Sequence, residues 1–543
     1  MAHLRLVVAL VLFFASSLVA VAQHEHHETG VAPPKLGTVH FQNTCKPEVQ
    51  ETFTRGVALL HSFWYDEAER QFLLVAEQDP SCGIAYWGAG MSGWHLLWEP
   101  SGPSPAKLKQ GQQWMQKAQA AGAHSEREKD FIAALSKFYA DSDKSPHIDR
   151  ALAYEQAMSD LHSKFPNDHE ATAFYALALL GAASSSAPDK TYARQRKAGA
   201  MLEPLAIQEP DHPGIEHYII HAYDYPALAP QALDAARRYA KVAPDAPHAL
   251  HMPSHIFTRL GLWQDSIDSN LASAAAARKN NLPGDELHAL DYLEFAYLQT
   301  AQDTRAAEIK KDLPHPTDQD AARFAGIFAE VTIPVRYAIE RRQWAEAAAL
   351  PTSSLPGGRY AWADATVYFA RSIGASRSGK ADQAQADVAK IASSKQALID
   401  VKETYWTTQV EIQRRAAEAW AQFASGKREE GLEEMRSAVA LDDATDKHPV
   451  TPGAVIPMRV LLGDMLLEMK RAGEAQEEFN KLLRTEPNRF AAVYGAARAA
   501  EINGDHKSAA EMYRQLNLLG ANGNTDRAEL KQAQKYLSLE AHR

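Results

Sequence analysis

Two pairs of histidines recur in register along this chain of 543 residues. His217 and His221 are four residues apart, and His251 and His255 repeat the pair 34 residues later. Residues four apart lie on one face of an α-helix, so each pair can direct two imidazoles to one point. Neutral imidazole nitrogens are good ligands for zinc and copper. The spacing therefore predicts one cofactor, a divalent transition metal (zinc or copper), held between neighbouring helices.

Three further residues extend this constellation. When the next segment is aligned by placing Ala306 at the small-residue position of the second helix, His288 occupies the position of His248, and Asp291 occupies the position of His217 and His251. The predicted ligand lining comprises His217, His221, His248, His251, His255, His288 and Asp291. Within that lining, the predicted metal ligands are His217, His221, His251, His255, His288 and Asp291. We expect Asp291 either to bind the metal itself or to orient a neighbouring imidazole.

Two other interpretations of the same histidines stay open. They can form a metal-free polar lining for a peptide or an acidic ligand, or a hydrogen-bonded structural network inside the fold. The direction of pH dependence separates a metal from an anion. A metal needs neutral imidazoles and is lost below pH ~6.5, whereas protonated imidazoles attract an anion more strongly.

The sequence contains no known catalytic motif. It lacks the C-x-x-C-H haem motif, a Gly-rich phosphate loop and the G-x-S-x-G nucleophile elbow. Residues His212 to His217 read H-x-x-x-E-H, one residue longer than the inverted zinc-protease motif. Catalytic residues are therefore unknown, and a binding protein is favoured over an enzyme.

Helices are expected to position these residues. Helical periodicity runs from Phe41 onward, with no convincing strand segment. Small and large residues recur at fixed offsets near both ends of the chain. The N-terminal set is Gly56, Ala68, Phe72 and Pro80, and the C-terminal set is Gly463, Ala475, Phe479 and Pro487. Small residues allow two helices to approach closely, and large ones fill the space between successive helix pairs.

With a period of 34 residues, this pattern resembles the tetratricopeptide repeat (TPR) family. The resemblance implies an all-α, right-handed superhelix (an α-solenoid) of stacked helical hairpins. It also implies that the histidine positions face the concave groove in which members of the family bind peptides. The segments at His212–Asp224 and His248–Gly261 look like segments of exported bacterial TPR proteins of unassigned function.

The sequence divides into five parts. We expect a signal peptide at residues 1–22, a disordered His-rich lead-in at 23–40, and an N-terminal repeat array with the histidines at 41–316. Degenerate helical repeats follow at 317–452, and a C-terminal TPR pair with a capping helix at 453–543. The expected breaks are Trp98–Pro105 and Leu355–Gly358, with longer connections at Ala183–Ala187 and Leu441–Pro452.

The first 22 residues predict export to the periplasm or the medium. Arg5 precedes an apolar run, and Ala20-Val21-Ala22 is a small-residue cleavage site. An uncleaved anchor is the alternative, and no later segment is apolar enough to span a membrane. The two cysteines, Cys45 and Cys82, flank the first expected hairpin at one end, which predicts a disulfide in an oxidising compartment. Two buried free thiols are the alternative.

Aromatic residues gather near the N-terminal end of the array. They are Phe63, Trp64, Tyr65, Tyr86, Trp87, Trp94 and Trp98, with His61 and His95 among them. Such a cluster is typical of an interhelical core, and the alternative is a platform that binds a sugar or a peptide.

The charge of the chain narrows the choice of partners. A formal net charge of −11 gives no electrostatic reason to bind nucleic acid or an anionic membrane. The sequence as a whole predicts an exported TPR scaffold that binds a peptide or protein partner in its groove and carries a His-rich metal or ligand site. The alternative is a metalloenzyme, a hydrolase or an oxidoreductase, that uses the same histidines.

Overall fold

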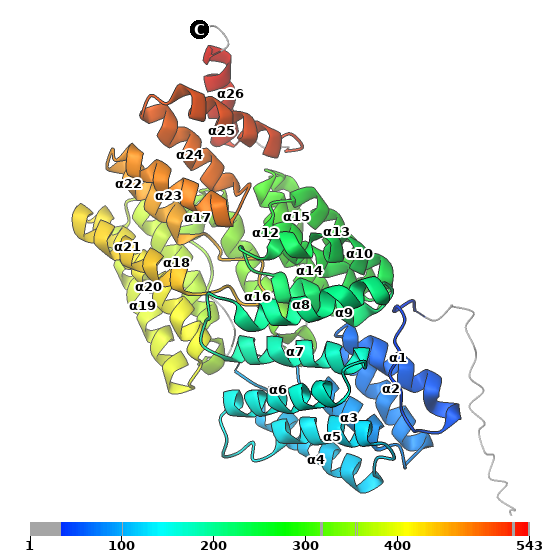
Figure 1. The fold of residues 1–543 in the computed structure, drawn as a ribbon. Helices are drawn as coiled ribbons and strands as arrows, with labels where there is room; N and C mark the ends of the chain where they lie inside the picture. Colours follow the sequence, from blue (N-terminus) through cyan, green and yellow to red (C-terminus); the bar gives the residue numbers. More distant parts are fainter. Residues whose placement is uncertain are drawn as a thin grey trace, which may run out of the picture. The chain divides into compact units, whose positions relative to one another are not determined.

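The structure of the chain is a computed structural model, which describes residues 34–99, 101–314, 319–352, 355, 357–523 and 527–540. Within these ranges the side chains of 319–323 are excepted, and no residue forms a β-strand. The protein is an all-α solenoid of helical hairpins (Figure 1). The predicted signal peptide lies outside the described residues. Among the described helices, none is both long enough and apolar enough to cross a membrane.

Most of the helices follow one another with short connections. In the N-terminal half they are η1 (Pro47–Val49), α1 (Gln50–His61), α2 (Tyr65–Gln78), α3 (Gly83–Ser92), α4 (Pro105–Ala121), α5 (Glu126–Tyr139), α6 (His147–Lys164), α7 (His169–Ser185), α8 (Ala193–Gln208), α9 (Pro213–Tyr223), η2 (Ala229–Ala232), α10 (Leu233–Val242), α11 (Pro247–His251), α12 (Pro253–Arg259) and α13 (Trp263–Lys279). The remaining helices are α14 (Pro283–Gln299), α15 (Asp303–Lys311), α16 (Gln319–Glu340), α17 (Trp344–Ala348), η3 (Gly358–Tyr360), α18 (Ala361–Arg377), α19 (Ala381–Asp400), α20 (Thr404–Ala424), α21 (Arg428–Ala444), α22 (Met458–Glu468), α23 (Ala472–Thr485), α24 (Phe490–Ile502), α25 (His506–Leu519) and α26 (Ala528–Glu540). Longer connections join α3 to α4 and α21 to α22.

Close packing of glycine on phenylalanine builds the hairpins at both ends of the array. A Cβ added to Gly463 or to Gly495 would lie 2.4 or 2.3 Å from the ring of Phe479. Gly88 has the same relation to Phe72, at 2.4 Å. Real Cβ atoms do not approach other atoms so closely, so only glycine fits at these positions. The small and large residues in the sequence therefore play the packing roles expected of them.

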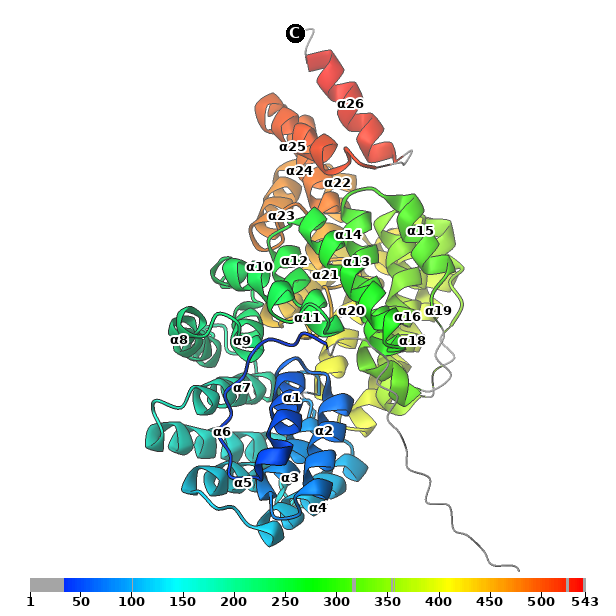
Figure 2. The same ribbon diagram turned by 90° about the vertical axis from the view of Figure 1, so that its right-hand side faces the viewer.

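The second half of the array returns to contact the first half (Figures 1 and 2). The indole N–H of Trp263 on α13 donates to the carbonyl of Asn488, 2.9 Å away, just before α24. Lys447, which follows α21, pairs with Asp224 at the end of α9, 2.8 Å away. Residues Lys35–Arg543 consequently form one compact unit.

Two of the predicted irregular segments differ in the structure. The lead-in is packed from Lys35 onward, because Leu36 and Val39 are buried and the backbone N–H of Thr38 donates to the Asp211 carbonyl at 2.9 Å. Helix α7 runs to Ser185, so most of the connection expected at Ala183–Ala187 is helical. Two more of the expected positions do contain connections, between α3 and α4 and between α21 and α22, although residues Leu441–Ala444 still belong to α21. Of the expected break at Leu355–Gly358, Pro356 lies outside the described residues, and Gly358 begins the short helix η3.

The disulfide predicted from the sequence is confirmed. Cys45 and Cys82 are bonded, with their Cα atoms 4.9 Å apart. Cys45 lies before α1 and Cys82 caps the start of α3, so the bond closes the first hairpin at one end. Such a bond stabilises mainly by restricting the unfolded chain.

Candidate metal centre

Six histidines form a continuous row across four helices, which we call the histidine row: His217, His221, His248, His251, His255 and His288. Helix α9 carries the first pair, α11 and α12 carry the next three, and α14 carries the last. Pro253 separates α11 from α12, because proline has no N–H to continue the helical hydrogen bonds. The interruption does not separate His251 from His255, whose Nε2 atoms lie 3.0 Å apart.

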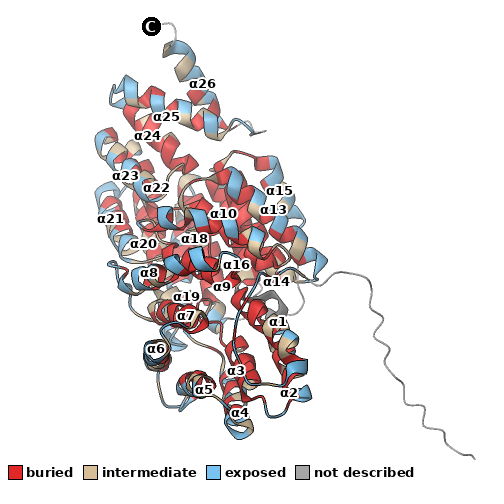
Figure 3. Ribbon diagram, turned by 45° about the vertical axis from the view of Figure 1, so that its right-hand side comes forward, coloured by how far each residue is buried: buried red, intermediate tan, exposed pale blue. Residues whose placement is uncertain are grey.

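The row lies in the interior of the array rather than in an open groove. Each of the six side chains belongs to a residue no more than 7 % exposed, and every residue of α9 is buried (Figure 3). The groove implied by the resemblance is therefore not what surrounds these imidazoles. Aromatic rings cover them instead: the Phe63 ring lies 4.3 Å from that of His217, and the Tyr292 ring lies 4.7 Å from that of His251.

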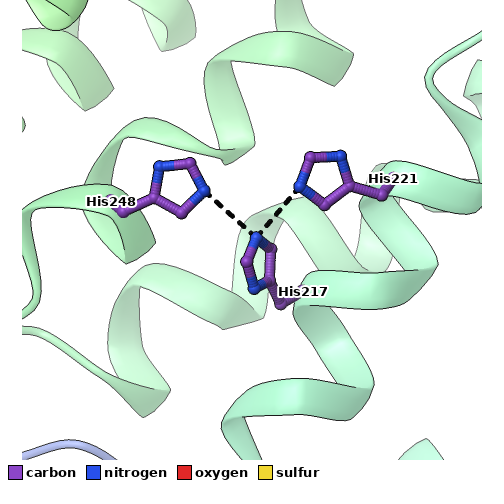
Figure 4. A group of neighbouring side chains, drawn as sticks. All are labelled: His217, His221 and His248. Atoms are coloured by element: carbon purple, nitrogen blue, oxygen red, sulfur yellow. Dashed lines mark hydrogen bonds between the residues drawn. The ribbon is translucent and has the colours of Figure 1, made fainter. Parts of the chain in front are cut away.

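The first three imidazoles converge on one nitrogen (Figure 4). The Nε2 atom of His217 lies 3.1 Å from Nε2 of His221 and 3.2 Å from Nε2 of His248. The Nδ1 atom of His217 lies 2.6 Å from the carbonyl oxygen of His61. Since a carbonyl can only accept, Nδ1 carries the proton and Nε2 of neutral His217 presents a lone pair. We call these three residues the first triad.

His251, His255 and His288 form a second triad. The His251 Nδ1 atom lies 2.7 Å from the side-chain oxygen of Asn270, whose amide nitrogen donates to a backbone carbonyl and so fixes the orientation of that amide. The His255 Nδ1 atom lies 3.0 Å from a carboxylate oxygen of Asp224. Both partners are acceptors, so in the neutral rings both Nδ1 atoms carry the proton. The two Nε2 atoms, 3.0 Å apart, therefore both present lone pairs to each other.

Burial keeps these imidazoles neutral. It lowers the pKa of His217 to about 3, and it lowers the pKa of His221, His248, His251 and His288 well below the usual value, with neighbouring imidazoles adding to the effect. Burial also lowers the pKa of His255, although Asp224 opposes it. At neutral pH a proton is therefore not the cation that separates the facing lone pairs.

Two of the predicted site residues differ from the prediction: Asp291 lies apart from the histidines, and His248 lies among the possible metal ligands. Asp291 does not join the histidines: its carboxylate lies 2.8 Å from the guanidinium of buried Arg336 and accepts a hydrogen bond from Thr332 at 3.2 Å. His248, predicted only as part of the lining, completes the first triad. Asp291 is one helical turn beyond His288 on α14, and at that turn its side chain contacts α16, which carries Arg336 and Thr332, rather than α12.

The residues that fix the rings were not found from the sequence. Asp224 accepts from His255, and it also pairs with Arg259 at 2.8 Å and with Lys447 at 2.8 Å. Burial alone would raise the pKa of this carboxyl, but Lys447, Arg259 and His255 hold it well below its usual range. Asp224 is the last residue of the segment His212–Asp224, and its position in that segment is the only signal in the sequence that could have indicated it.

A second network lies behind the first triad, and its polar atoms are matched in pairs. Glu170 bridges Nε2 of His61 at 2.9 Å and Nε2 of His212 at 3.3 Å. The other nitrogen of His61 lies 2.9 Å from the Tyr218 hydroxyl, and that of His212 accepts from the backbone N–H of Ile215. Every ring nitrogen here has a partner of the opposite kind, so hydrogen bonds alone explain the cluster. No spacing in the sequence links these residues, which come from separate helices.

The connection between α21 and α22 lies over the second triad, and we call it the covering loop (residues 445–457). The Tyr292 hydroxyl, which contacts His255, donates to the carbonyl of Thr451 at 2.9 Å. The ring of His448 is buried against Trp406, and Lys447 reaches Asp224. A cavity of about 520 Å³ is lined in part by this loop, and the residues that line it include none of the six histidines.

Comparisons with known proteins add little to this picture. No family model matches the sequence, and no curated protein matches it. Solved structures similar to the chain include the TPR domain of P58(IPK), at 11% identity over 91% of this chain and 100% of that one, with a TM-score of 0.22. Another is Naa15/Naa10 bound to HypK-THB, at 11% identity over 90% of this chain and 72% of that one, with a TM-score of 0.23. Scores this low carry no argument, so the fold rests on the helices described above.

Proposed function

We propose that this protein is an exported helical-repeat protein that binds a divalent transition metal in its histidine row. One observation carries the proposal: the Nε2 atoms of His251 and His255 lie 3.0 Å apart and both present lone pairs. Two lone pairs at that distance repel each other unless a cation lies between them. A metal ion relieves the repulsion and uses both lone pairs as ligands.

The spacing of the nitrogens suits such an ion. At a metal–nitrogen distance of ~2.0–2.1 Å, two nitrogens 3.0 to 3.2 Å apart subtend roughly 90–105° at the metal. Angles in this range belong to ordinary tetrahedral and octahedral coordination. Zinc and copper both accept a set of neutral imidazoles, and hard cations such as magnesium prefer oxygen.

The surroundings of the rings also support a metal. Histidine ligands in metal sites usually donate their other N–H to a carboxylate or a carbonyl, which fixes the tautomer and makes the ligand nitrogen more basic. His255 donates to Asp224, His251 to Asn270, and His217 to the His61 carbonyl. The Glu170 network shows the contrast, because there the second nitrogen of each ring already has a hydrogen-bond partner.

Export and a protein partner are the further parts of the proposal. The Cys45–Cys82 disulfide supports an oxidising compartment, in keeping with the leader-like first 22 residues. A partner peptide is expected to enter the 520 Å³ cavity beside the covering loop, since the histidine row itself is buried. No feature of the described residues favours a catalytic role over this one.

Metal analysis of protein purified without a histidine tag tests the proposal. We expect zinc or copper to copurify, or to bind at neutral pH after treatment with a chelator. The decisive variant replaces both His251 and His255 with Asn, whose amide can still donate from the position of Nδ1 but offers no ligand at Nε2. This variant should lose metal while its circular dichroism stays helical.

His147→Gln is the matched control, because His147 is a partly buried histidine on α6, with its pKa lowered to about 4 mainly by burial, and its ring contacts Ser185 rather than the row. It should bind metal as the wild type does. If wild-type protein takes up neither zinc nor copper at neutral pH, the proposal is wrong. Equal metal uptake by wild type and the Asn variant would contradict it as well.

A further inference from the structure

We propose that the histidine row holds two metal ions side by side, one in each triad. This inference rests on the proposed function and adds the number of ions and their separation. Neither the spacing of the histidines nor the resemblance to TPR proteins predicts a pair of ions. The argument comes from where the ligand atoms converge, what supports each set, and how close the two sets lie.

The ligand atoms converge in two groups. Within each triad the three ligand atoms lie within 4.8 Å of one another, whereas the six do not form one such group. Two nitrogens bound to the same zinc or copper ion can be no more than about 4.2 Å apart, twice the metal–nitrogen distance. A single ion therefore cannot reach all six imidazoles, and we assign one ion to each triad, in which Nε2 atoms 3.0 to 3.2 Å apart lie within that limit.

Each triad has its own supporting contacts. In the first, the carbonyl of His61 fixes the tautomer of His217. In the second, Asn270 and Asp224 fix the tautomers of His251 and His255. His288 completes the second triad, and its Nδ1 atom is buried without a hydrogen-bond partner. Two independently supported ligand sets are the arrangement expected of two sites rather than of one site with spare ligands.

The two sites adjoin each other. The ring centroids of His248 and His251, which belong to different triads, are 6.0 Å apart, and those of His221 and His255 are 6.2 Å apart. An ion lies roughly 3 Å from the centroid of a ring that binds it through one nitrogen. The distance from one ion to the His248 centroid, from that centroid to the His251 centroid, and from there to the other ion together place the two ions at most about 12 Å apart. Two divalent ions at this range repel each other, so the second should bind more weakly than the first.

The experiment uses copper(II) and the full chain, freed of metal by a chelator. Copper content is measured as ions per chain, together with the electron paramagnetic resonance spectrum at full loading. Wild type should take up two ions per chain in two steps, with a spectrum broadened by dipolar coupling between the ions. Two variants each disable one triad: His217→Asn with His221→Asn, and His251→Asn with His255→Asn. Each should take up one ion and give an unbroadened spectrum.

The outcomes separate this inference from the proposed function. If wild type binds one ion and both variants lose it, the proposed metal-binding function stands, and the inference of two ions is wrong. Two ions in wild type without dipolar broadening would overturn their adjacency. No copper or zinc in wild type would overturn the proposed function itself. The wild-type stoichiometry and spectrum decide the matter even if a variant fails to fold.

Discussion

Replacing Asp224 with Asn tests whether the carboxylate behind His255 tunes the second triad. Asp224 is buried and accepts from His255 at 3.0 Å, from Arg259 at 2.8 Å and from Lys447 at 2.8 Å. Loss of such a supporting partner typically lowers metal affinity by about 10–100-fold, which corresponds to roughly 1.4–2.7 kcal/mol. We expect a decrease of this size for the ion in the second triad alone, because His217 and its carbonyl partner are untouched.

The same change leaves two cations without their carboxylate, so it also affects stability. Removing one partner from a buried ion pair costs about 3–5 kcal/mol. Adding Lys447→Met removes one of the two uncompensated charges, and the double variant should recover part of this loss. The metal affinity should remain low in the double variant, because the partner of His255 is still an amide.

Competition with a chelator of known affinity measures the two binding steps separately. Glu216→Gln is the matched control: Glu216 is a buried carboxylate on α9 that pairs with Arg238 at 2.7 Å and not with an imidazole. It should leave both steps unchanged. Equal affinity for wild type and Asp224→Asn would refute the role given to Asp224, and so would an equal decrease at both triads.

Three further predictions concern the fold. Burial places the pKa values of the histidine row below those of the same residues in the unfolded chain, so the unfolded chain binds more protons under acid. The metal-free protein should therefore lose stability progressively below pH ~6.5. Urea unfolding between pH 7.5 and 5 measures this loss. Gly463→Ala should destabilise by about 1–3 kcal/mol through the contact with Phe479, whereas Gly473→Ala, whose Cβ would meet nothing within 4 Å, should be neutral or slightly stabilising in the same assay. Replacing Cys45 and Cys82 with Ser should lower stability by about 3–4 kcal/mol in the loop-entropy model, for a sequence separation of 37, measured by urea unfolding against the oxidised wild type.

Each of these has a result that would contradict it. A stability that is flat or rises from pH 7.5 to 5 would mean that the row is not kept neutral by burial. Equal effects of the two glycine changes would show that close packing on Phe479 is not what requires glycine at position 463. An unchanged midpoint without the cysteines would mean that the bond adds no constraint beyond the packed hairpin.

The sequence by itself determined the parts of this protein that depend on local periodicity. The four-residue spacing of His217 and His221 places both rings on one helical face, and the 34-residue recurrence brings His251 and His255 beside them. The same repeat fixes the helical hairpins, since glycine and phenylalanine offsets such as that between Gly463 and Phe479 follow directly from helix geometry. The cysteine pair is also local, because it closes a single hairpin.

Only the tertiary structure decided which neighbours those side chains meet. Asp291 has the right spacing for a ligand, yet it pairs with Arg336, 45 residues later, because α16 lies against that turn of α14. Asp224 receives Lys447 from 223 residues away, and the six histidines are buried, although the resemblance to TPR proteins implies a groove at their positions. Periodicity sets the direction of a side chain on its own helix, whereas contacts between distant segments depend on how the whole array closes on itself, which no local spacing encodes.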